Sequence, residues 1–470
     1  MTRASNRKNI LLLALTLAVV MLGFGVVIPV FPFYIRSMGA SGDELGLLIA
    51  ISPFIQLIFA PIWGNVSDRI GRKPVLMAGI LGYGLSMLFF GLATQLWMLY
   101  VIRGLGAMLS AATLPTTNAY VGDSTAEEDR SAAMGILGAA TGLGMMLGPA
   151  LGGWLAEGAL ATPFFVTAAF CLLTLALIAL LLPESLPAAA RKNVLDPRAR
   201  HDAASAGANV MLSELTGQRR SQQDTSEASW RSQRDPSLDL SYRGSCVVDP
   251  LRVTVGAIRS AASQIRTLWR ALFGPLGVLL LLTALASFGL ANFQGIFGLY
   301  GMQRFGFGAQ EVGWIMTAVA VVAAVGQGLL TGPLSRRWGD VTVMRVSLLL
   351  SAVTFLLLLL ADSFWTALAA TALFVLPNSL VRVALTSLTS QRADAGQGVA
   401  MGLSHAFMSL GRIVGPLLAG VLFDLDIRLP YLVGAAAMAA GFAVGLAWVT
   451  RASPLQTTCP PVQSAHPPSG

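Results

Sequence analysis

Long apolar runs alternate with short polar connections over most of the chain. Each run has about 20 residues, which is the length a helix needs to cross the hydrocarbon core of a bilayer. The pattern therefore predicts an all-α membrane protein with twelve transmembrane helices. They fall into two six-helix bundles, at 1–183 and 273–452. The expected spans are 10–34, 46–66, 75–93, 97–120, 133–156, 163–183, 273–299, 312–332, 342–361, 364–386, 399–422 and 430–450.

Two stretches break this pattern. Residues 184–272 form a polar linker rich in Ser, Arg, Asp and Gln, which we expect to be cytoplasmic and mostly disordered. Near its end, one helical face carries arginines and lies opposite apolar residues; the arginines are Arg252, Arg259, Arg266 and Arg270. This favours an amphipathic helix on the inner leaflet, with a soluble linker helix as the alternative. The Pro-rich tail at 453–470 is predicted to be disordered.

Composition supports the bilayer as the solvent. Hydrophobic residues make up 55% of the 470 residues and charged residues only 11%, whereas soluble proteins carry roughly a quarter. The net charge of +8 lies in the connections rather than on one face, so it indicates membrane topology and not a nucleic-acid partner. The three cysteines have no disulfide or zinc spacing, and we expect neither cofactor nor metal.

The basic residues of the short connections set the orientation. Lys and Arg are retained on the cytoplasmic side of a membrane protein. Alternate connections are rich in them, whereas the others carry single arginines, so both termini are predicted to be cytoplasmic. We expect a multi-pass protein of the plasma membrane. The basic residues are Arg3, Arg7 and Lys8, then Arg69, Arg72 and Lys73, then Arg336 and Arg337, and finally Arg451.

An internal repeat relates the two predicted bundles. A glycine pattern in the fifth span returns in the eleventh, with an offset of 267 residues between Gly135 and Gly402. The connections after the second and eighth spans begin at Gly64 and Gly332, an offset of 268. Two features that keep their order and spacing indicate two halves related by an axis along the membrane normal. The two patterns are Gly135, Gly144, Gly148, Pro149, Gly152 and Gly153, and Gly402, Gly411, Gly415, Pro416 and Gly420.

The glycines of this pattern lie near one face of a helix. A face without side chains lets another helix approach closely, and Gly-Pro favours a bend. The long pattern, present twice, favours a gated surface that moves against the other half. The alternative is a static close-packed interface.

The segment GNVSDRIGRK follows the second span. It predicts a tight charged turn at the membrane surface, in which Gly64 and Gly71 permit close approach and unusual backbone angles. Asp68 would face or cap a helix end, while Arg69, Arg72 and Lys73 would bridge to acids such as Asp123. Charges that pair in one state and separate in another would form a two-state latch. Positive-inside anchoring is the alternative, and it leaves Asp68 and the glycines unexplained.

These motifs resemble those of the major facilitator superfamily, within it the twelve-helix drug/proton antiporters. GNVSDRIGRK resembles the family's loop motif, the 135–153 pattern its fifth-helix antiporter motif, and Arg103-Gly104-Leu105-Gly106 its fourth-helix motif. The resemblance implies a secondary transporter, not an enzyme, that exports small, largely apolar compounds in exchange for protons by alternating access. It also implies a proton-coupling role for Arg103, with a structural arginine as the alternative. An uptake carrier for a metabolite on the same fold is the alternative function.

Charges inside the predicted spans are functional candidates by default. His405 and Arg412 lie in the eleventh span. His405 is a second candidate for proton coupling, because histidine titrates near neutrality, although a satisfied buried histidine is the alternative. The chain departs from the family pattern here, since Gln294 stands where some similar exporters place an acid, and the tenth span offers Asn378, again without an acid. Arginines without matching acids would tolerate neutral or anionic compounds.

The predicted substrate pocket lies near the midplane. Flexible methionines and flat aromatic rings adapt to varied apolar ligands, although such residues also pack against neighbouring helices or lipid. We expect the partners to be a small-molecule substrate, protons and the lipid bilayer, and the protein to be a monomer. The candidate lining residues are Phe31, Met108, Met145, Met146, Phe293, Gln294, Asn378 and Arg412.

Overall fold

The computed structural model describes residues 3–125, 127–186, 276–392 and 397–449. The helix predicted before the seventh span and the tail at 453–470 lie outside the described residues, as does nearly all of the linker expected at 184–272.

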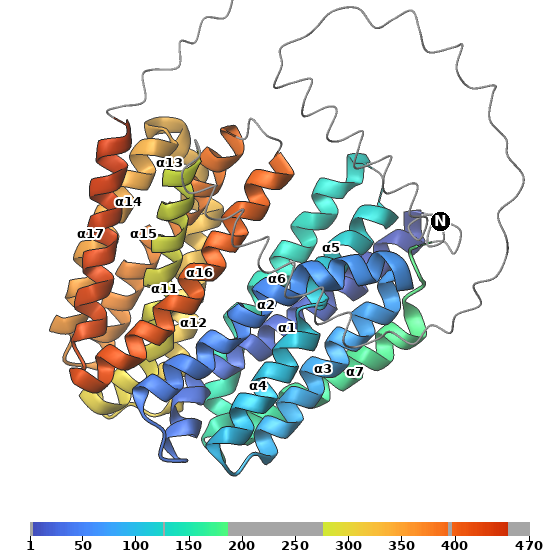
Figure 1. The fold of residues 1–470 in the computed structure, drawn as a ribbon, viewed down its shortest axis with the longest axis horizontal. Coiled ribbons are helices and arrows are strands. Elements are labelled where there is room, and N and C mark those ends of the chain that lie inside the picture. The colour runs from blue at the N-terminus through green and yellow to red at the C-terminus, as the bar shows by residue number, and fades with distance from the viewer. Residues whose placement is uncertain (1–2, 126, 187–275, 393–396, 450–470) are drawn as a thin grey trace, which may run out of the picture. The chain divides into compact units, whose positions relative to one another are not determined.

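The described residues form helices joined by short connections (Figure 1). Twelve helical segments are long and apolar enough to cross a membrane, from Lys8–Arg36 to Leu429–Ala447. They correspond one by one to the twelve predicted spans, which confirms the fold class. The elements are α1 Arg3–Arg36, α2 Gly42–Ile70, α3 Arg72–Leu92, α4 Leu96–Ser110, α5 Thr113–Ser124, α6 Glu127–Ala156, α7 Thr162–Leu181, α11 Gly277–Phe305, α12 Ala309–Val325, η1 Gly326–Leu330, α13 Thr331–Trp338, α14 Asp340–Leu357, η2 Leu358–Leu360, α15 Phe364–Gln391, α16 Gln397–Leu425 and α17 Leu429–Val449.

Contacts divide the chain into two compact units. Unit 1 is Met1–Tyr34 with Ile51–Thr267, and unit 2 is Ile35–Ala50 with Leu268–Gly470. The sequence led us to expect residues 35–50 in the first bundle. The structure groups them with unit 2, because the first turns of α2 pack against α16.

Unit 1 is held together by α3 against α4 and α7, and by α6 against α1. Gly144 and Gly148 lie on the backbone of α1. A methyl group at Gly148 would lie 2.5 Å from the carbonyl oxygen of Leu22 and 2.6 Å from Cα of Gly25. Only glycine permits this approach. The close-packed interface therefore accounts for these glycines, and it lies within one unit rather than at the gated surface that we expected.

Unit 2 repeats this contact between α16 and α11. Gly411 lies on the backbone of α11 near Phe288, as Gly144 does on α1. A methyl group at Gly415 would lie 2.9 Å from the amide nitrogen of Asn292 and 2.9 Å from the carbonyl oxygen of Phe288. The repeat seen in the sequence is thus a repeat of helix packing. Gly135 and Gly402, the first glycines of the two patterns, have no neighbour within 4 Å of an added methyl group.

Two of the spans are not continuous α-helices. The fourth span consists of α4 and α5, with a turn at Ala111 and Ala112, and the eighth contains the π-helical segment η1 between α12 and α13. The Thr331 hydroxyl donates to the carbonyl oxygen of Gly326, 3.0 Å away, at this segment. Local changes of helix type re-satisfy backbone groups in a membrane without an exposed loop.

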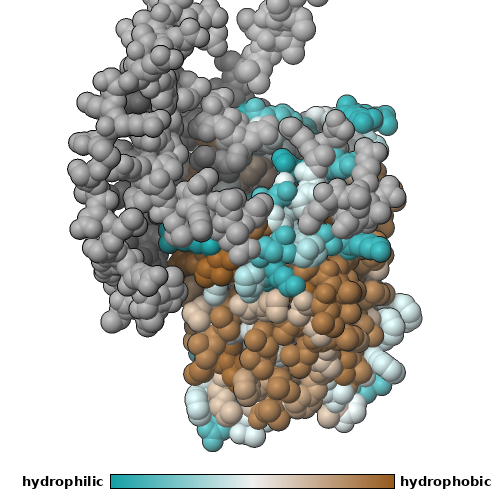
Figure 2. All heavy atoms as spheres, turned by 90° about the vertical axis from the view of Figure 1, so that its right-hand side faces the viewer, coloured by the Kyte–Doolittle hydropathy of each residue, from teal (hydrophilic) through white to brown (hydrophobic). Residues whose placement is uncertain are grey.

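Hydroxyl groups within the spans bond mainly to their own helices. Thr16 donates to the Leu12 carbonyl oxygen at 2.8 Å, and Thr283 donates to that of Leu279 at 2.8 Å. This i−4 bond satisfies the hydroxyl where water is absent. The outer surface is correspondingly apolar, and Figure 2 shows a broad apolar face with polar residues gathered toward one end.

The glycine contact in unit 1 gives a stability prediction. Gly148→Ala should lower the free energy of unfolding by about 1–3 kcal/mol, because the added methyl group forces α1 and α6 apart. Gly142→Ala, on the same helix with nothing within 4 Å, should be neutral or stabilise by up to about 1 kcal/mol. Thermal unfolding of the two purified variants in detergent checks this. Equal Tm values would contradict the packing role.

Candidate functional site

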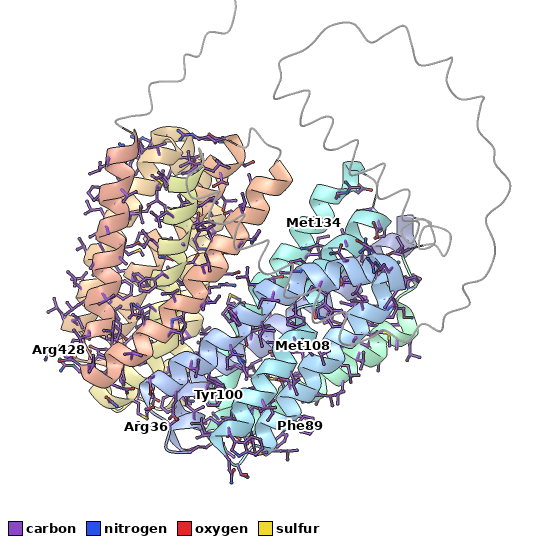
Figure 3. The ribbon with its side chains drawn as sticks, in the orientation of Figure 1. Arg36, Phe89, Tyr100, Met108, Met134 and Arg428 are labelled. Carbon is purple, nitrogen blue, oxygen red and sulfur yellow. The ribbon has the colours of Figure 1, made fainter. Side chains whose placement is uncertain are left out.

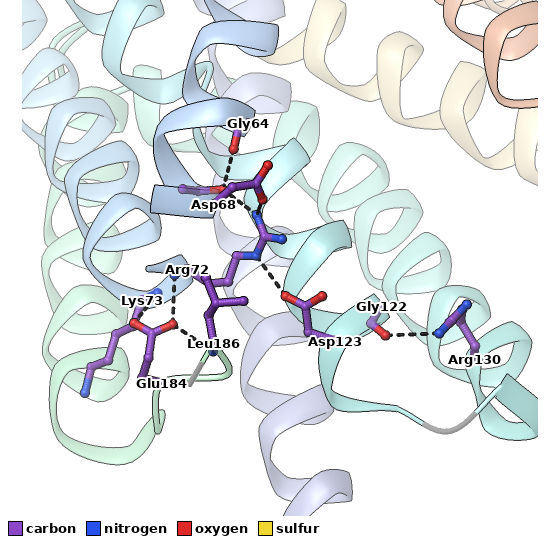
Figure 4. Close-up of polar contacts among 10 residues, drawn as sticks. Gly64, Asp68, Arg72, Lys73, Gly122, Asp123, Arg130, Glu184 and Leu186 are labelled. Carbon is purple, nitrogen blue, oxygen red and sulfur yellow. Dashed lines mark hydrogen bonds and ion pairs between the residues drawn. The ribbon is translucent and has the colours of Figure 1, made fainter. Parts of the chain in front are cut away.

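A network of charges joins α2, α3 and α5 in unit 1 (Figure 4). Arg72 pairs with Asp68, and its Nε donates to Oδ2 of Asp123 at 2.9 Å. Its Nη1 donates to the Ser67 hydroxyl at 2.7 Å. Glu184 accepts a hydrogen bond from the Arg72 backbone amide at 2.8 Å. We call Ser67, Asp68, Arg72, Asp123 and Glu184 the Arg72 cluster. Because the Arg72 side chain is only 10% exposed, the geometry of these bonds is fixed by the packing.

The backbone of this segment differs from the predicted turn. Residues 64–70 continue α2, and α3 begins at Arg72, so Gly71 alone connects them. Gly71 has φ 120° and ψ 157°, which favours glycine strongly. The close approach expected at Gly64 is not seen, since nothing lies within 4 Å of an added methyl group. The Gly64 carbonyl oxygen instead accepts from the Ser67 hydroxyl at 2.9 Å.

The other basic residues of the segment behave differently from Arg72. Lys73 Nζ donates to the carbonyl oxygen of Ala179 at 2.8 Å, and its backbone amide donates to Glu184 at 3.3 Å. Arg69 is exposed and has no hydrogen bond or ion pair among the residues that the structure describes. Positive-inside anchoring suffices for Arg69, whereas Arg72 organises a cluster.

Arg103 lies inside unit 1. Its guanidinium carbon is 5.3 Å from the centroid of the Phe31 ring, and the residue is 9% exposed. Its Nε is buried without a hydrogen-bond partner among the described residues. Tyr83, on α3, is close enough to interact electrostatically with it.

The predicted pocket residues fall into two groups. Phe31 and Phe293 are 1% and 0% exposed and lie in aromatic clusters, Phe31 against Phe90 and Phe293 against Phe297 and Phe374. They are core residues of their units rather than an exposed lining. Asn378 is also buried, and its amide donates to the Ala286 carbonyl oxygen at 3.4 Å.

The remaining candidates are more accessible. Met108, labelled in Figure 3, is half-buried, and its carbonyl oxygen accepts from Trp63 Nε1 at 2.6 Å. Met145, Met146 and Gln294 are half-buried as well. His405 and Arg412 are exposed along α16. They occupy unit 2, whereas Arg103 and Met108 occupy unit 1.

Two acids in the structure were not anticipated. Glu184 follows α7 and accepts from the first amides of α3. Asp424 ends α16 and accepts from Gly42 N at 2.9 Å and Asp43 N at 2.8 Å. Carboxylates favour helix N-termini and are disfavoured at C-termini. An acid in the last turn of an apolar helix was therefore a signal that Asp424 has a partner elsewhere.

The comparison with protein families decides the identity. The family model described as Major Facilitator Superfamily matches residues 13–308 and 279–469. The chain belongs to the major facilitator superfamily. The family predicted from the motifs is confirmed, and this major facilitator protein is a multi-pass membrane transporter, not an enzyme.

Relatives match over nearly their whole length. The chain is 30% identical over 448 residues to Multidrug resistance protein 1 of Bacillus subtilis (strain 168), covering 94% of the chain and 97% of that protein. It is 24% identical over 441 residues to Quinolone resistance protein NorA of Staphylococcus aureus, covering 93% and 96%. Both likenesses span the two halves and the linker, so the transporter resembles these relatives as a whole.

Solved structures share the fold. A bacterial homologue of the human lysosomal transporter Spinster, inward-facing and occupied, superposes with a TM-score of 0.68 at 15% identity, over 96% of each chain. The human organic anion transporter MFSD10 gives 0.58 at 21% identity, over 95% of this chain and 100% of that one. At these identities the likeness establishes the major facilitator fold alone.

The Arg72 cluster predicts a measurable coupling. In a double-mutant cycle of Arg72→Gln and Asp123→Asn, the coupling free energy of unfolding should be about 0.5–3 kcal/mol, because the two side chains bond directly. Arg69→Gln is the matched control and should show no coupling to Asp123→Asn. Thermal or denaturant unfolding in detergent measures both cycles. A coupling near zero for Arg72 would mean that its bond to Asp123 adds nothing to stability.

Proposed function

We propose that this transporter exports small, largely apolar compounds, drugs among them, in exchange for protons by alternating access. The observation that carries the proposal is the end-to-end likeness to relatives named for multidrug and quinolone resistance. The glycine-lined contact repeated in each unit supports it, because two halves built alike are what alternating access requires.

The Arg72 cluster would act as a latch in this cycle. Two carboxylates, Asp68 and Asp123, pair with one guanidinium that is nearly buried. Charge-assisted bonds of this kind contribute roughly 1.5–3 kcal/mol each, which is enough to shift a two-state equilibrium about tenfold or more. Separation of α3 from α5 would break the Arg72–Asp123 pair, and the loss of this bond would shift the equilibrium between the two conformations.

Proton coupling would use groups that the resemblance and the sequence single out. Arg103 and His405 are the candidates within the spans, while Asp68 and Asp123 are candidates at their ends. The proposed orientation has both termini in the cytoplasm, which puts the Arg72 cluster on the cytoplasmic side, and we propose that the protein works as a monomer.

Transport in vesicles tests the proposal. Inside-out vesicles are prepared from an efflux-deficient host that expresses the full chain. They should accumulate ethidium when the vesicle lumen is made more acidic than the outside. Collapse of the gradient with nigericin should abolish accumulation. Vesicles without the protein are the control. Ethidium movement that is unaffected by nigericin would contradict proton exchange, and absence of movement for any drug tested would contradict export.

The latch gives a second arm of the same assay. Asp123→Asn should change the maximal rate of ethidium transport several-fold, because it weakens the bond to Arg72 and so loosens one conformational state. Arg69→Gln, whose side chain has no bond among the described residues, should transport at the wild-type rate. Equal rates for the two variants would argue against the latch.

A further inference from the structure

The ionisable groups of the spans are distributed unevenly by sign. Every carboxylate within the described spans lies in the first or last turn of its span, whereas three arginines, Arg103, Arg382 and Arg412, lie well inside. Arg103 is the buried one. The interior of unit 1 therefore holds a permanent positive charge with no acid at its depth.

The surroundings of Arg103 do not neutralise it. The Phe31 ring centroid lies 5.3 Å from its guanidinium carbon. A cation–π contact contributes about 0.5–2 kcal/mol, whereas burial of an unpaired ion costs several kcal/mol. Arginine cannot avoid that cost by losing its proton. Within the described part of the chain, its side chain has no ion pair or hydrogen bond, and Nε is buried and unpartnered.

A second unsatisfied donor lies nearby. Tyr83 is 3% exposed, and its hydroxyl is buried with no partner among the described residues. Its ring stacks on that of Phe24 in α1, with 5.2 Å between the ring centroids, so the packing holds the hydroxyl in place. A donor held in position without an acceptor, beside a guanidinium that also lacks one, is chemically complementary to an oxyanion.

We propose that Arg103 and Tyr83 form a recognition site for an anionic group, a carboxylate in the first instance, on an otherwise apolar substrate. The inference rests on the proposed export function and narrows its substrate class. The carboxylate would accept from the guanidinium and from the tyrosine hydroxyl, while Phe31 and Phe24 provide the apolar surroundings. A compound whose carboxyl group is masked would leave both donors unsatisfied and bind less tightly.

The test compares an acid with its ester. Binding of norfloxacin, which carries a carboxylate, and of norfloxacin methyl ester is measured on the purified full-length protein in detergent, with ethidium as a ligand without a carboxyl group. The wild-type protein should bind the acid about tenfold or more tightly than the ester, as expected for one charge-assisted hydrogen bond. Tyr83→Phe should lower this ratio a few-fold, and Arg103→Gln should bring it close to one.

Control variants separate recognition from folding. Arg103→Gln should keep or strengthen ethidium binding, because a repelling cation has been removed, which shows that the variant is folded. Arg345→Gln removes an arginine whose side chain bonds to the Gly445 and Leu446 carbonyl oxygens, and it should leave the acid-to-ester ratio unchanged. Arg103→Lys should keep part of the preference, because the charge remains but its fork of donors does not.

The outcomes are distinct. If the wild-type protein binds the acid and the ester with nearly equal affinity, while ethidium is bound and transported, the anion site is overturned and export is left intact. A ratio that persists in Arg103→Gln would also overturn the site, since the preference would arise elsewhere. Absence of binding for all three compounds would contradict both the site and the proposed export function.

A different observation supports a second proposal, at the start of α2. Asp424 accepts from the amides of Gly42 and Asp43, and Gly46 lies directly on the carbonyl oxygen of Pro416 in α16. Gly420 lies on the Gly42 carbonyl oxygen. The first turns of α2 thus belong to unit 2, while the residues from Ile51 onward belong to unit 1.

One continuous helix is therefore shared by two compact units. Pro53 lies three residues after Ala50, the last residue assigned to unit 2, and a proline inside a helix removes a backbone hydrogen bond and permits a kink. A change in the direction of α2 would either bend the helix near Pro53 or break the contact of its first turns with α16. We propose that the bonds to Asp424 are the releasable contact, a second latch at the opposite end of α2 from the Arg72 cluster.

Hydrogen exchange and transport together test this second latch. In Asp424→Ala, the amides of Gly42 and Asp43 should exchange about tenfold or more faster than in wild type, and the maximal rate of ethidium transport should change several-fold. Asp426→Ala, which removes an acid bonded only locally to the Arg428 amide at 2.7 Å, should match wild type in both. Asp424→Asn, which keeps the shape, should show a smaller change than Asp424→Ala.

The two readouts distinguish a latch from a simple helix cap. Faster exchange with unchanged transport would overturn the latch and leave a cap. Unchanged exchange would overturn the contact itself. If ethidium is not transported by the wild-type protein, the export proposal fails, and faster exchange in Asp424→Ala alone would then support the contact without a transport role.

Discussion

The close approach of one helix pair in each unit is the constraint on which the rest of the structure depends. Lipid gives no hydrophobic drive for helices to associate, so packing relies on small residues that bring backbones together. Gly144 and Gly148 do this for α6 on α1, and Gly411 and Gly415 for α16 on α11. Once α1 is fixed in this way, another of its faces brings Phe24 against Tyr83 and Phe31 against Arg103. The buried charge is therefore positioned by the glycines of another helix.

The repeat also shows how one backbone can carry two different polar sites. Gly71 and Gly339 both have positive φ and both join two helices, and they are 268 residues apart, the offset seen in the connections. The same offset relates Arg72 to Asp340 and Asp123 to Gln391. In unit 1 the arginine bonds to the acid, whereas in unit 2 Asp340 accepts from Gln391 at 3.0 Å. The two positions are thus in contact in both units. In unit 1 the residue that begins the helix donates, whereas in unit 2 it accepts, and only one of the two unit 2 side chains is charged.

The spans, the repeat and the family could be predicted from the sequence, because span length and glycine spacing are local properties of the chain. Sequence reasoning did not find Glu184 or Asp424, whose partners lie 112 and 382 residues away along the chain. It also took Phe31 and Phe293 for pocket lining, although both are buried. Which face of an apolar helix meets its neighbours is decided by tertiary packing, and in a span that is apolar all round the sequence holds little record of it.

The position of the carboxylates constrains how protons could drive such a transporter. Within the described spans they lie only in terminal turns, and Asp68, Asp123, Asp340 and Asp424 each bond to another part of the chain. Protonation of any of them would weaken the contact that it makes, since a neutral acid is a poorer acceptor. Proton binding and release of a helix end would then be a single event. A central carboxylate that exchanges its proton for a substrate would not be required, and the interior would be left with the positive charge of Arg103.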